Sequence, residues 1–453
     1  MKKKLLLLLV CSMTAVCGFA QATSGTCGEN LTWSFDSSTG TLTISGTGEM
    51  WNYAFYNYSY NSLTKHVEIG SNVTNIGDYT FPYFTNLTSV TIPASITSIG
   101  NCAFFQCNSL VSIEVESTNP MYASEDEVLF NKEKTMLIRC SPKSKSGTSS
   151  SYIIPNSVTS IEDDAFEGCL FTSIIIPEGV VSIGTYAFLN CIRLTSVTIP
   201  STVTTIGNSV FLYCSRLTSI EVESTNPMYM SESGIVFNKA KTTLILCPSH
   251  KLDSYIIPNT VTIIASLAFE NCMLSSVTIP NSVISIGDEA FRSMYNLTSI
   301  TIPSSVISIG ERAFYYCSRL TSVKVNWKNP ISITSEVFGS YNVTLSEITL
   351  LVSSGTAENY RAVEVWKEFN IVEGTSSIEN MQIPSINIYP NPAMESFNAS
   401  GITEPTVVTI SDITGKTVQQ QIVVPNETIT IGHLQKGIYF VTVKGKTVKL
   451  IKQ

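Results

Sequence analysis

The sequence predicts a solenoid of short parallel strands with a short helical or irregular far side, followed by a small C-terminal all-β sandwich. Three observations carry this prediction. A unit of 23 residues recurs with apolar residues at fixed places, proline ends the short alternating runs, and the composition changes after about residue 375. A unit this short cannot bury its own apolar face, so neighbouring units must stack around one core.

The physics of one unit follows from its residues. Val-Thr-Ile alternates, which indicates a short strand with Val and Ile inward and Thr outward, and the following proline ends strand pairing because it lacks the N–H group. Gly then allows a tight bend, and Ala-Phe-x-x-Cys predicts a turn of α- or 3₁₀-helix on the far side. The four clearest copies are Leu87–Ser109, Leu194–Arg216, Leu274–Asn296 and Leu297–Arg319.

The cysteines follow the repeat. Six of them stand three residues after a Phe, at Cys107, Cys169, Cys191, Cys214, Cys272 and Cys317. One repeated position predicts one repeated environment, a column of buried thiols, because free Cys behaves as a small hydrophobe. Cys140 and Cys247 occupy matching places in two insertions, and a disulfide among these two, Cys27 and Cys102 stays open.

These residues resemble the BspA-like subclass of leucine-rich repeat proteins. The resemblance covers about residues 63–340 and predicts repeats over residues 63–350, with insertions near 117–151 and 224–254. It implies a bacterial surface or secreted protein, and several members of the subclass are adhesins. The insertions are copies of each other, since Ile113–Tyr122 recurs as Ile220–Tyr229, and a hairpin-like stretch follows each. Insertions in solenoids map to loops on one face, often the binding face; a duplication relic without a ligand is the alternative.

The segments on either side of the repeats predict an export signal and two caps. Residues 1–20 have the basic and apolar regions of a signal peptide, with a lipoprotein site as the weaker alternative, and residues 21–62 predict an N-terminal β cap. The aromatic run Trp51–Tyr60 either covers the first coil or forms a contact patch. Residues 351–374 predict a C-terminal cap helix, because Tyr360, Val363 and Trp366 have near-helical spacing, and a polar linker spans residues 375–385.

Residues 386–453 resemble the type A C-terminal sorting domain of the type IX secretion system. The motifs are YPNP at Tyr389–Pro392, D-x-x-G-K at Asp412–Lys416, L-x-x-G-x-Y-x-V at Leu434–Val441 and a lysine-rich end. The resemblance implies handling by the type IX machinery, passage across the outer membrane, removal of this domain, and attachment at the cell surface or release. After the signal peptide, no apolar stretch approaches the length of a transmembrane span.

Composition argues against catalysis and nucleic-acid binding. Charged residues are 14% of the chain, against roughly 25% in ordinary proteins, and a net charge of −8 is unsuited to neutralising phosphates. Three histidines, His66, His250 and His433, leave little for metal or acid–base work, and no H-E-x-x-H, C-x-x-C or G-x-S-x-G motif occurs. We expect no enzyme, cofactor or metal site. Glu125–Glu127 and the pair Asp163 and Asp164 are expected in solvated loops, with calcium binding through their carboxylate oxygens as the weaker alternative.

A binding face is the remaining functional prediction. The outward strand positions form a hydroxyl-rich ladder with acidic residues in the two variant coils, suited to a protein or glycan partner on a host or microbial surface. The alternatives are a structural spacer without a specific ligand and, third, a hydrolase. The predicted partner-binding residues are Ser89, Thr91, Glu114, Glu116, Ser196, Thr198, Glu221, Glu223, Ser276, Thr278, Ser299 and Thr301.

Overall fold

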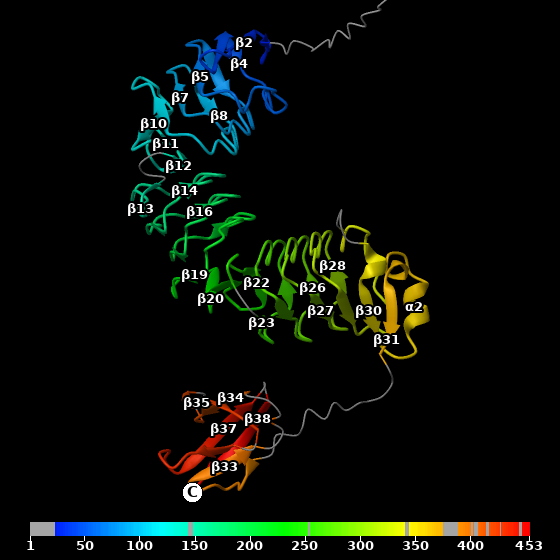
Figure 1. Cartoon of the computed structure of the whole chain (residues 1–453). Helices are drawn as coiled ribbons and strands as arrows, with labels where there is room; N and C mark the ends of the chain where they lie inside the picture. The colour runs from blue at the N-terminus through cyan, green and yellow to red at the C-terminus, as the bar shows by residue number, and fades with distance from the viewer. Residues whose placement is uncertain are drawn as a thin grey trace, which may run out of the picture. The chain divides into compact units, whose positions relative to one another are not determined.

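A computed structural model describes residues 23–143, 148–251, 254–339, 344–374, 388–399, 402, 406–413, 416–425, 427–443 and 446–453 (Figure 1). The chain forms two compact units. The first runs to Val372, and the second holds Glu373–Gln453 with Ser353–Gly355. The predicted signal peptide and the predicted linker lie outside the described residues.

The predicted parallel solenoid is confirmed, with two strand ladders running along the first unit. The first ladder carries the Val-Thr-Ile strands. Its members are β1 (Ser24–Thr26), β2 (Leu31–Asp36), β3 (Thr41–Gly46), β5 (His66–Ile69), β7 (Ser89–Ile92), β9 (Ser112–Val115), β13 (Ser151–Ile153), β15 (Ser173–Ile175), β17 (Ser196–Ile199), β19 (Ser219–Val222), β23 (Ser254–Ile256), β25 (Ser276–Thr278), β27 (Ser299–Ile302), β29 (Ser322–Val325), β30 (Thr349–Val352) and β31 (Asn370–Glu373).

The second ladder combines two-residue strands that follow the repeat proline with longer strands from the insertions and the N-terminal end. Its members are β4 (Gly48–Glu49), β6 (Val73–Ile76), β8 (Ser98–Ile99), β10 (Tyr122–Glu125), β11 (Val128–Asn131), β12 (Met136–Cys140), β14 (Ser160–Ile161), β16 (Ser182–Ile183), β18 (Thr205–Ile206), β20 (Tyr229–Glu232), β21 (Ile235–Asn238), β22 (Thr243–Leu246), β24 (Ile263–Ile264), β26 (Ser285–Ile286) and β28 (Ser308–Ile309).

The far side of each coil is irregular, so the predicted turn of helix does not form there. Two residues four positions apart have positive φ, for example Tyr186 (58°) and Asn190 (58°). This geometry turns alternate N–H groups toward the next coil, where Phe188 N donates to Val210 O at 2.9 Å. The far-side turn keeps some internal bonds, such as Cys191 N to Phe188 O at 3.2 Å, but its other N–H groups bond to the next coil, which a continuous helix would not allow.

The glycine that follows β8, β16, β18, β26 and β28 is required by close approach. A Cβ atom on Gly207 would lie 2.4 Å from Thr185 N of the preceding coil, and one on Gly310 would lie 2.3 Å from Asp288 N. Neither glycine has positive φ. The predicted bend therefore has a different cause, since the coils stack too closely there for any side chain.

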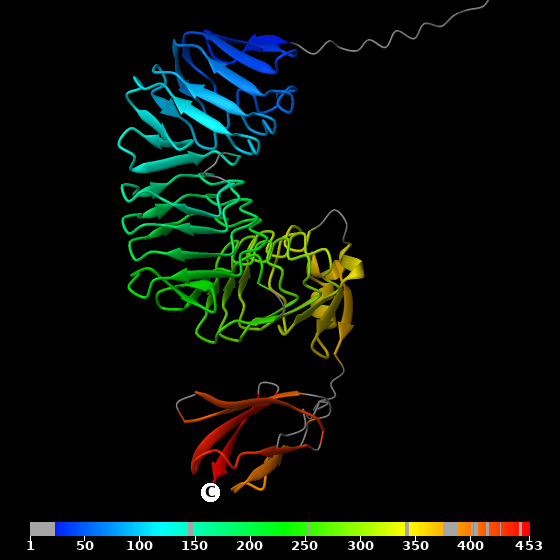
Figure 2. The same ribbon diagram turned by 60° about the vertical axis from the view of Figure 1, so that its left-hand side comes forward.

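Stacked phenylalanines form the centre of the core, inside the stacked coils whose backbone Figure 2 draws. Phe269, Phe291 and Phe314 lie parallel with ring centroids 5.0 Å apart. The buried apolar residues separate into three clusters, whose borders fall at the two insertions. The solenoid is therefore three stacked blocks with a partition between each pair.

Each insertion supplies the partition, which corrects the expectation of loops on one face. Strands β10, β11 and β12 are antiparallel, and β12 then joins the second ladder by pairing in parallel with β14. Both faces of β11 are buried: Leu129 packs into the first cluster, while Val128 and Phe130 pack into the second. Such a strand stabilises the solenoid by continuing the core, and it does not project from it.

One duplicated asparagine anchors each insertion. The Asn119 amide donates to Pro93 O and Ile96 O at 2.8 and 3.0 Å, and its carbonyl accepts from the N–H groups of residues 121 and 122. Asn226 makes the equivalent bonds. Because a buried amide needs all of these partners, the side chain fixes the chain direction after the first ladder.

The two ends of the solenoid are covered differently. Phe55 and Tyr58 from the aromatic run are buried against Phe81 and Phe84. Trp51, Tyr53 and Tyr56 stay exposed. The run therefore covers the first coil with part of its side chains only.

At the other end, the predicted single helix from Ala357 to Phe369 is wrong. The chain forms α2 (Ala357–Arg361), a 3₁₀ turn η2 (Trp366–Glu368) and the edge strand β31, after a preceding 3₁₀ turn η1 (Leu345–Glu347). Val365 has φ of 68°, which ends any helix at that point. Tyr360 and Trp366 are nevertheless buried, and they donate to Trp327 O and Ile331 O.

The second unit is an antiparallel all-β unit with its own core, as predicted. One sheet has the order β32-β33-β36 and the other β35-β34-β37-β38. Phe397, Val408 and Val441 are among the residues buried between them. The strands are β32 (Ile388–Tyr389), β33 (Ser396–Ala399), β34 (Thr406–Ser411), β35 (Thr417–Val423), β36 (Thr428–Thr430), β37 (Gly437–Val443) and β38 (Lys446–Lys452).

Candidate partner-binding face

The outward side of the first ladder carries most of the predicted partner-binding residues in two columns. In the serine column, Ser89 lies opposite Ser112 and Ser196 opposite Ser219. In the threonine column, Thr91 is followed by Glu114 and Thr198 by Glu221. Ser276 and Thr278 on β25 lie beside Ser299 and Thr301 on β27. Except for the half-buried Ser89, these predicted side chains are exposed.

The insertions divide these columns into three segments, because no first-ladder strands pair across them, between β9 and β13 or between β19 and β23. Strand pairing is also interrupted inside two segments, between β15 and β17 and between β25 and β27. The twelve predicted residues therefore do not form one continuous ladder. Each of the first two segments ends on a glutamate, whereas the third carries Lys324 beside Thr301. The face is thus three hydroxyl-rich patches with different charge at their ends.

Glu116 and Glu223 do not belong to the columns. Each follows the end of its strand and accepts a backbone N–H of the preceding coil, from Ala94 at 2.8 Å and from Ser201 at 3.2 Å. These bonds satisfy the turn after Pro93 and Pro200. These bonds explain why a glutamate occupies the same position in both copies. The residue pattern alone could not distinguish this structural role from a binding role.

Other side chains on the face were missed. His66 occupies the serine column next to Ser89, with 2.9 Å between Nδ1 and Oγ. Glu68 occupies the threonine column of β5 beside Thr43. Both residues lie in a repeat that departs from the consensus, so the repeat pattern does not mark them. Counting back one repeat from Ser89 and Thr91 would have identified both positions.

The cysteine column is buried and reduced. All ten described cysteines are free, and Cys102 alone among them is partly exposed. Burial raises the pKa of Cys107 and of Cys317 to about 12, because a thiolate would lose its hydration there. The insertion cysteines extend the column, with Cys247 Sγ 3.4 Å from Cys272 Sγ. No disulfide forms among Cys27, Cys102, Cys140 and Cys247.

These thiols are expected to be inert in the folded protein. In a C11A/C17A background, which removes two cysteines outside the described residues, a thiol-reactive chromogenic reagent should label Cys102 slowly and the other nine after unfolding in guanidinium. The reason is that thiolate, not thiol, reacts. Replacing Cys102 by Ser, the residue at the matching position 209, should remove the slow native reaction. Rapid labelling of several thiols without denaturant would contradict the buried column.

The C-terminal motifs perform structural tasks in the second unit. The Asn391 amide donates to Lys449 O at 2.7 Å and accepts from Ile451 N at 2.9 Å, which holds the YPNP segment on β38. The Tyr439 hydroxyl donates to Gln435 O at 2.9 Å. Asp412 and Lys416 close their turn with Asp412 N donating to Lys416 O. Each of the three motifs therefore makes a hydrogen bond to the backbone within the second unit.

Family models match both units. The BspA type leucine-rich repeat region matches residues 44–135, 144–249 and 245–360, in six copies. The chain belongs to the BspA-type leucine-rich repeat family. The secretion system C-terminal sorting domain matches residues 387–453. This BspA-type protein is therefore exported by the type IX secretion machinery to the cell surface or the extracellular medium.

Solved structures resemble the BspA-type chain as well. One is a leucine-rich repeat protein from Eubacterium ventriosum, with 26% identity, 74% of this chain and 80% of that chain covered, and a TM-score of 0.45. A leucine-rich cell surface protein from Faecalibacterium prausnitzii has 23% identity, coverages of 77% and 98%, and a TM-score of 0.46. The pneumococcal vaccine antigen PcpA has 18% identity, coverages of 78% and 99%, and a TM-score of 0.44. No curated protein matches the chain.

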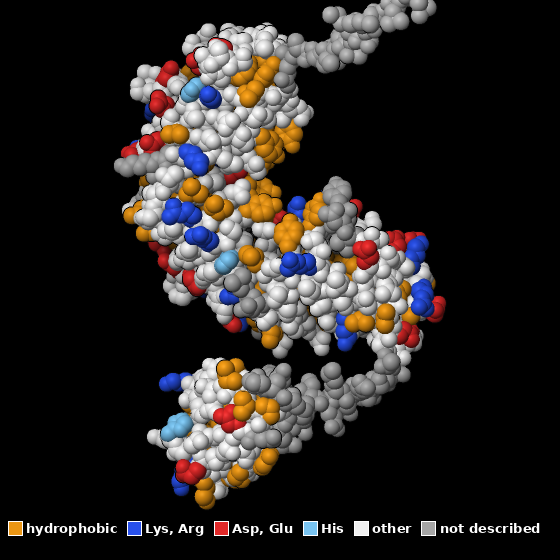
Figure 3. All heavy atoms as spheres, viewed as in Figure 1, with side chains coloured by type: hydrophobic (Ala, Val, Ile, Leu, Met, Phe, Trp, Pro, Cys, Tyr) orange, Lys and Arg blue, Asp and Glu red, His pale blue; other side chains and the backbone are white. Residues whose placement is uncertain are grey.

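In the described part of this BspA-type protein, no group of three His, Cys, Asp or Glu side chains is arranged to hold a metal ion. Over the same residues, no helix has both the length and the apolar character that crossing a membrane requires. Most of the described surface in view in Figure 3 is coloured as neither charged nor hydrophobic, so the polar strand face is typical of this surface.

Proposed function

We propose that this exported protein is an adhesin or interaction protein that binds a protein or glycan partner through the outward face of its first strand ladder. The observation that carries the proposal is the register of that face. Thr91 beside Glu114 and Thr198 beside Glu221 repeat the same pair of exposed groups in two copies. A partner that contacts one pair meets the same chemistry at the second.

The chemistry of the face supports a polar, extended contact. Hydroxyl groups both donate and accept hydrogen bonds, and the carboxylates are strong acceptors, so the face suits sugar hydroxyls or a polar protein surface. Ser231 Oγ donates to Glu221 at 3.0 Å, and this side chain stays exposed. Exposed serine and threonine also suit strands without any ligand, so a direct test is needed.

Substituting both column glutamates tests the proposal. The E114Q/E221Q variant is expected to bind host matrix proteins, mucin glycans or partner bacteria at least about fivefold more weakly, because two charge-assisted hydrogen bonds are lost. Binding is measured on surfaces coated with each class. E358Q/E364Q, which changes two exposed glutamates on the C-terminal cap, is the matched control. Background binding by the unmodified protein on every surface would favour a spacer instead.

A further inference from the structure

Five aromatic side chains form one surface on the far-side turns of the first coils. Tyr53 stacks on Tyr79 with the ring centroids 5.3 Å apart. Phe105 makes edge-on contacts with both Tyr79 and Tyr83, at 5.9 and 5.6 Å. Tyr56 contacts Tyr83 at 6.1 Å and Tyr53 at 5.8 Å, so the contacts close a circuit in which each ring touches two others. Tyr53, Tyr56 and Tyr83 are 53%, 43% and 37% exposed, and the other two rings are half-buried.

The fold does not require aromatic residues at these places. Tyr53 stands two residues before the core phenylalanine of its coil, and Tyr56 stands one residue after it. In the coil that contains Phe291, the same two places hold Glu289 and Arg292, which form an ion pair at 2.6 Å. The solenoid therefore accepts charged residues there. Aromatic rings that gather in an exposed patch instead mark an interaction surface.

The turns that carry this aromatic surface are almost free of charge. No Lys or Arg occurs in them, and they span residues 50–61, 77–84 and 100–107. Asp78 is their one charged residue. Its carboxylate accepts from Asn52 Nδ2 at 3.2 Å and from Asn101 N at 2.8 Å, so its oxygens already have partners. The aromatic surface therefore suits a ligand without charge.

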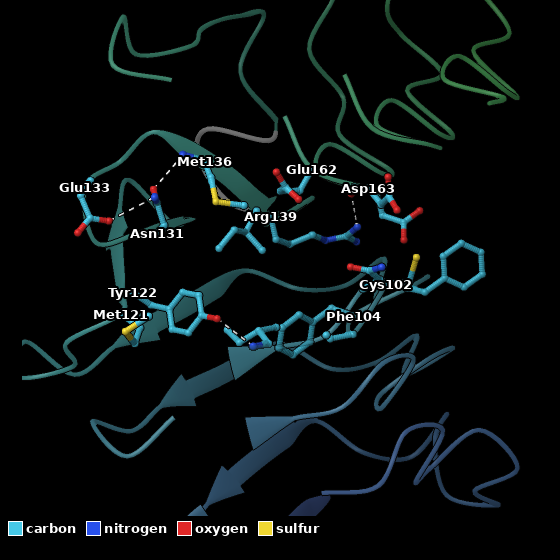
Figure 4. A pocket seen from close by; sticks show the side chains of 17 residues that line it. Cys102, Phe104, Met121, Tyr122, Asn131, Glu133, Met136, Arg139, Glu162 and Asp163 are labelled. Carbon is cyan, nitrogen blue, oxygen red and sulfur yellow. Dashed lines mark hydrogen bonds between the residues drawn. The ribbon is translucent and has the colours of Figure 1, made fainter. Parts of the chain in front are cut away.

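The charged residues of the neighbouring partition do not change this character. Arg139 and Asp164 line the cavity there (Figure 4), and Arg139 Nη1 lies 3.1 Å from the buried Glu167 Oε2. Asp164 is 2% exposed, so the expectation of a solvated loop at this residue is wrong, because the next coil stacks over it. The duplicated unit has Leu246 and Leu267 at the positions of Arg139 and Asp164. Arg139 is thus held against Glu167 and offers no positive charge to a ligand on the aromatic surface.

Exposed amide groups lie beside the rings. Asn57 follows Tyr56 in the chain, and the backbone carbonyl of Asn101 accepts from Tyr79 N at 3.0 Å. Both asparagine side chains are exposed. An amide both donates and accepts hydrogen bonds, as does a tyrosine hydroxyl. The surface thus offers apolar ring faces together with neutral polar groups at their edges.

These two kinds of group match those of an uncharged sugar. A pyranose with equatorial hydroxyl groups presents C–H groups on its faces, and these pack against the negative face of an aromatic ring. Its hydroxyls both donate and accept, so they satisfy amide and tyrosine groups alike. A proline-rich segment also packs on aromatic rings, but its prolines have no N–H group to donate. A lipid surface with anionic headgroups would require basic residues.

We propose that the aromatic surface binds a neutral oligosaccharide built of pyranose rings with equatorial hydroxyl groups. Tyr53, Tyr56 and Tyr83 contact the faces of the sugar rings, while the half-buried Tyr79 and Phe105 keep them in position. Because the rings are fixed before the ligand arrives, little side-chain freedom is lost on binding. The far-side turns hold none of the residues of the strand face, so this site is independent of the function proposed for that face.

Isothermal titration calorimetry on the full chain compares the candidate ligands. Cellohexaose or chitohexaose should bind, with a Kd that changes less than about twofold between about 0.05 and 0.5 M NaCl, since no charge takes part. Binding of cellohexaose identifies a plain glucan and binding of chitohexaose an N-acetylated glycan; both support the sugar site. No binding of either hexasaccharide, or tighter binding of decaproline or of phosphatidylcholine vesicles, would overturn it.

Variants locate the binding on the five rings. Y53S/Y56S/Y83S should weaken the hexasaccharide at least about tenfold, whereas Y53F/Y56F/Y83F, which keeps the ring faces, should weaken it less than about threefold. Y213S/Y295S is the matched control, because Tyr213 and Tyr295 are 44% and 48% exposed and lie outside this surface. Circular dichroism checks that each variant is folded. An unchanged Kd in the serine variant, or an equal loss in Y213S/Y295S, would contradict the site. E114Q/E221Q should leave the Kd unchanged, which separates this site from the strand face.

Discussion

Removal of residues 386–453 is expected to abolish surface display and to leave the repeat unit in the periplasm. The reason is that the described residues between 388 and 453 pack around a core of their own, and none of them is among the buried residues of the three solenoid cores. The repeat unit should therefore remain folded while it loses the region that the secretion machinery handles. Protease accessibility on intact cells, together with fractionation, measures the loss.

Two controls separate export from folding in this experiment. The truncated protein should keep its circular dichroism and its inert thiols, which shows an intact solenoid. A periplasmic reporter fused to residues 375–453 should appear at the cell surface. Normal display of the truncation, or a fusion that stays in the periplasm, would contradict the assignment of the sorting function to this unit.

The period of the sequence predicted those parts of the fold that repeat. Val197 and Phe188 are buried because every coil places these residue types in the same two columns, so reading one copy predicts the others. The backbone conformation of the far-side turn could not be predicted in this way. Positive φ at Tyr186 and Asn190 depends on hydrogen bonds to the next coil. Tyrosine has no intrinsic preference for positive φ, so the sequence near Tyr186 does not predict this conformation.

Features outside the 23-residue unit could not be obtained from its period. The hairpin-like stretch that contains Val128–Phe130 was predicted, but that the two faces of its strand belong to different cores follows only from the partition. Asp163 and Asp164 look like an exposed acidic pair, and the stacking of the next coil buries Asp164. Leucine at the matching position, Leu267, was the available signal, since it marks a site that the fold covers.

Replacing Arg139 by leucine is expected to destabilise the first partition by about 3–5 kcal/mol, the usual cost of leaving one member of a buried ion pair without its partner. Glu167 is fully buried, and its Oε2 atom also accepts from Gln106 N at 2.8 Å. Without Arg139, this carboxylate has a single N–H partner for its charge. Hydrogen exchange of residues 99–107 and 160–168, with the midpoint of urea unfolding, measures the change.

The loss should depend on pH in a defined direction. Burial already raises the pKa of Glu167, and Arg139 opposes that shift. In R139L the folded pKa rises further, so the folded state holds a proton that the unfolded chain releases, and stability falls as pH rises above the unfolded value. The destabilisation should therefore be smaller near pH 4 than near pH 8.

The triple variant R139L/D164L/E167Q decides whether the charges serve stability. It places leucine where the second copy has Leu246 and Leu267, and the glutamine carbonyl still accepts from Gln106 N. Replacing a buried ion pair by well-packed apolar residues is often neutral or stabilising, so this variant should be as stable as the unmodified protein, with little pH dependence at the partition. If it is as unstable as R139L, the network is needed for folding. A stable triple variant means that the first copy retains its charges for something other than the fold.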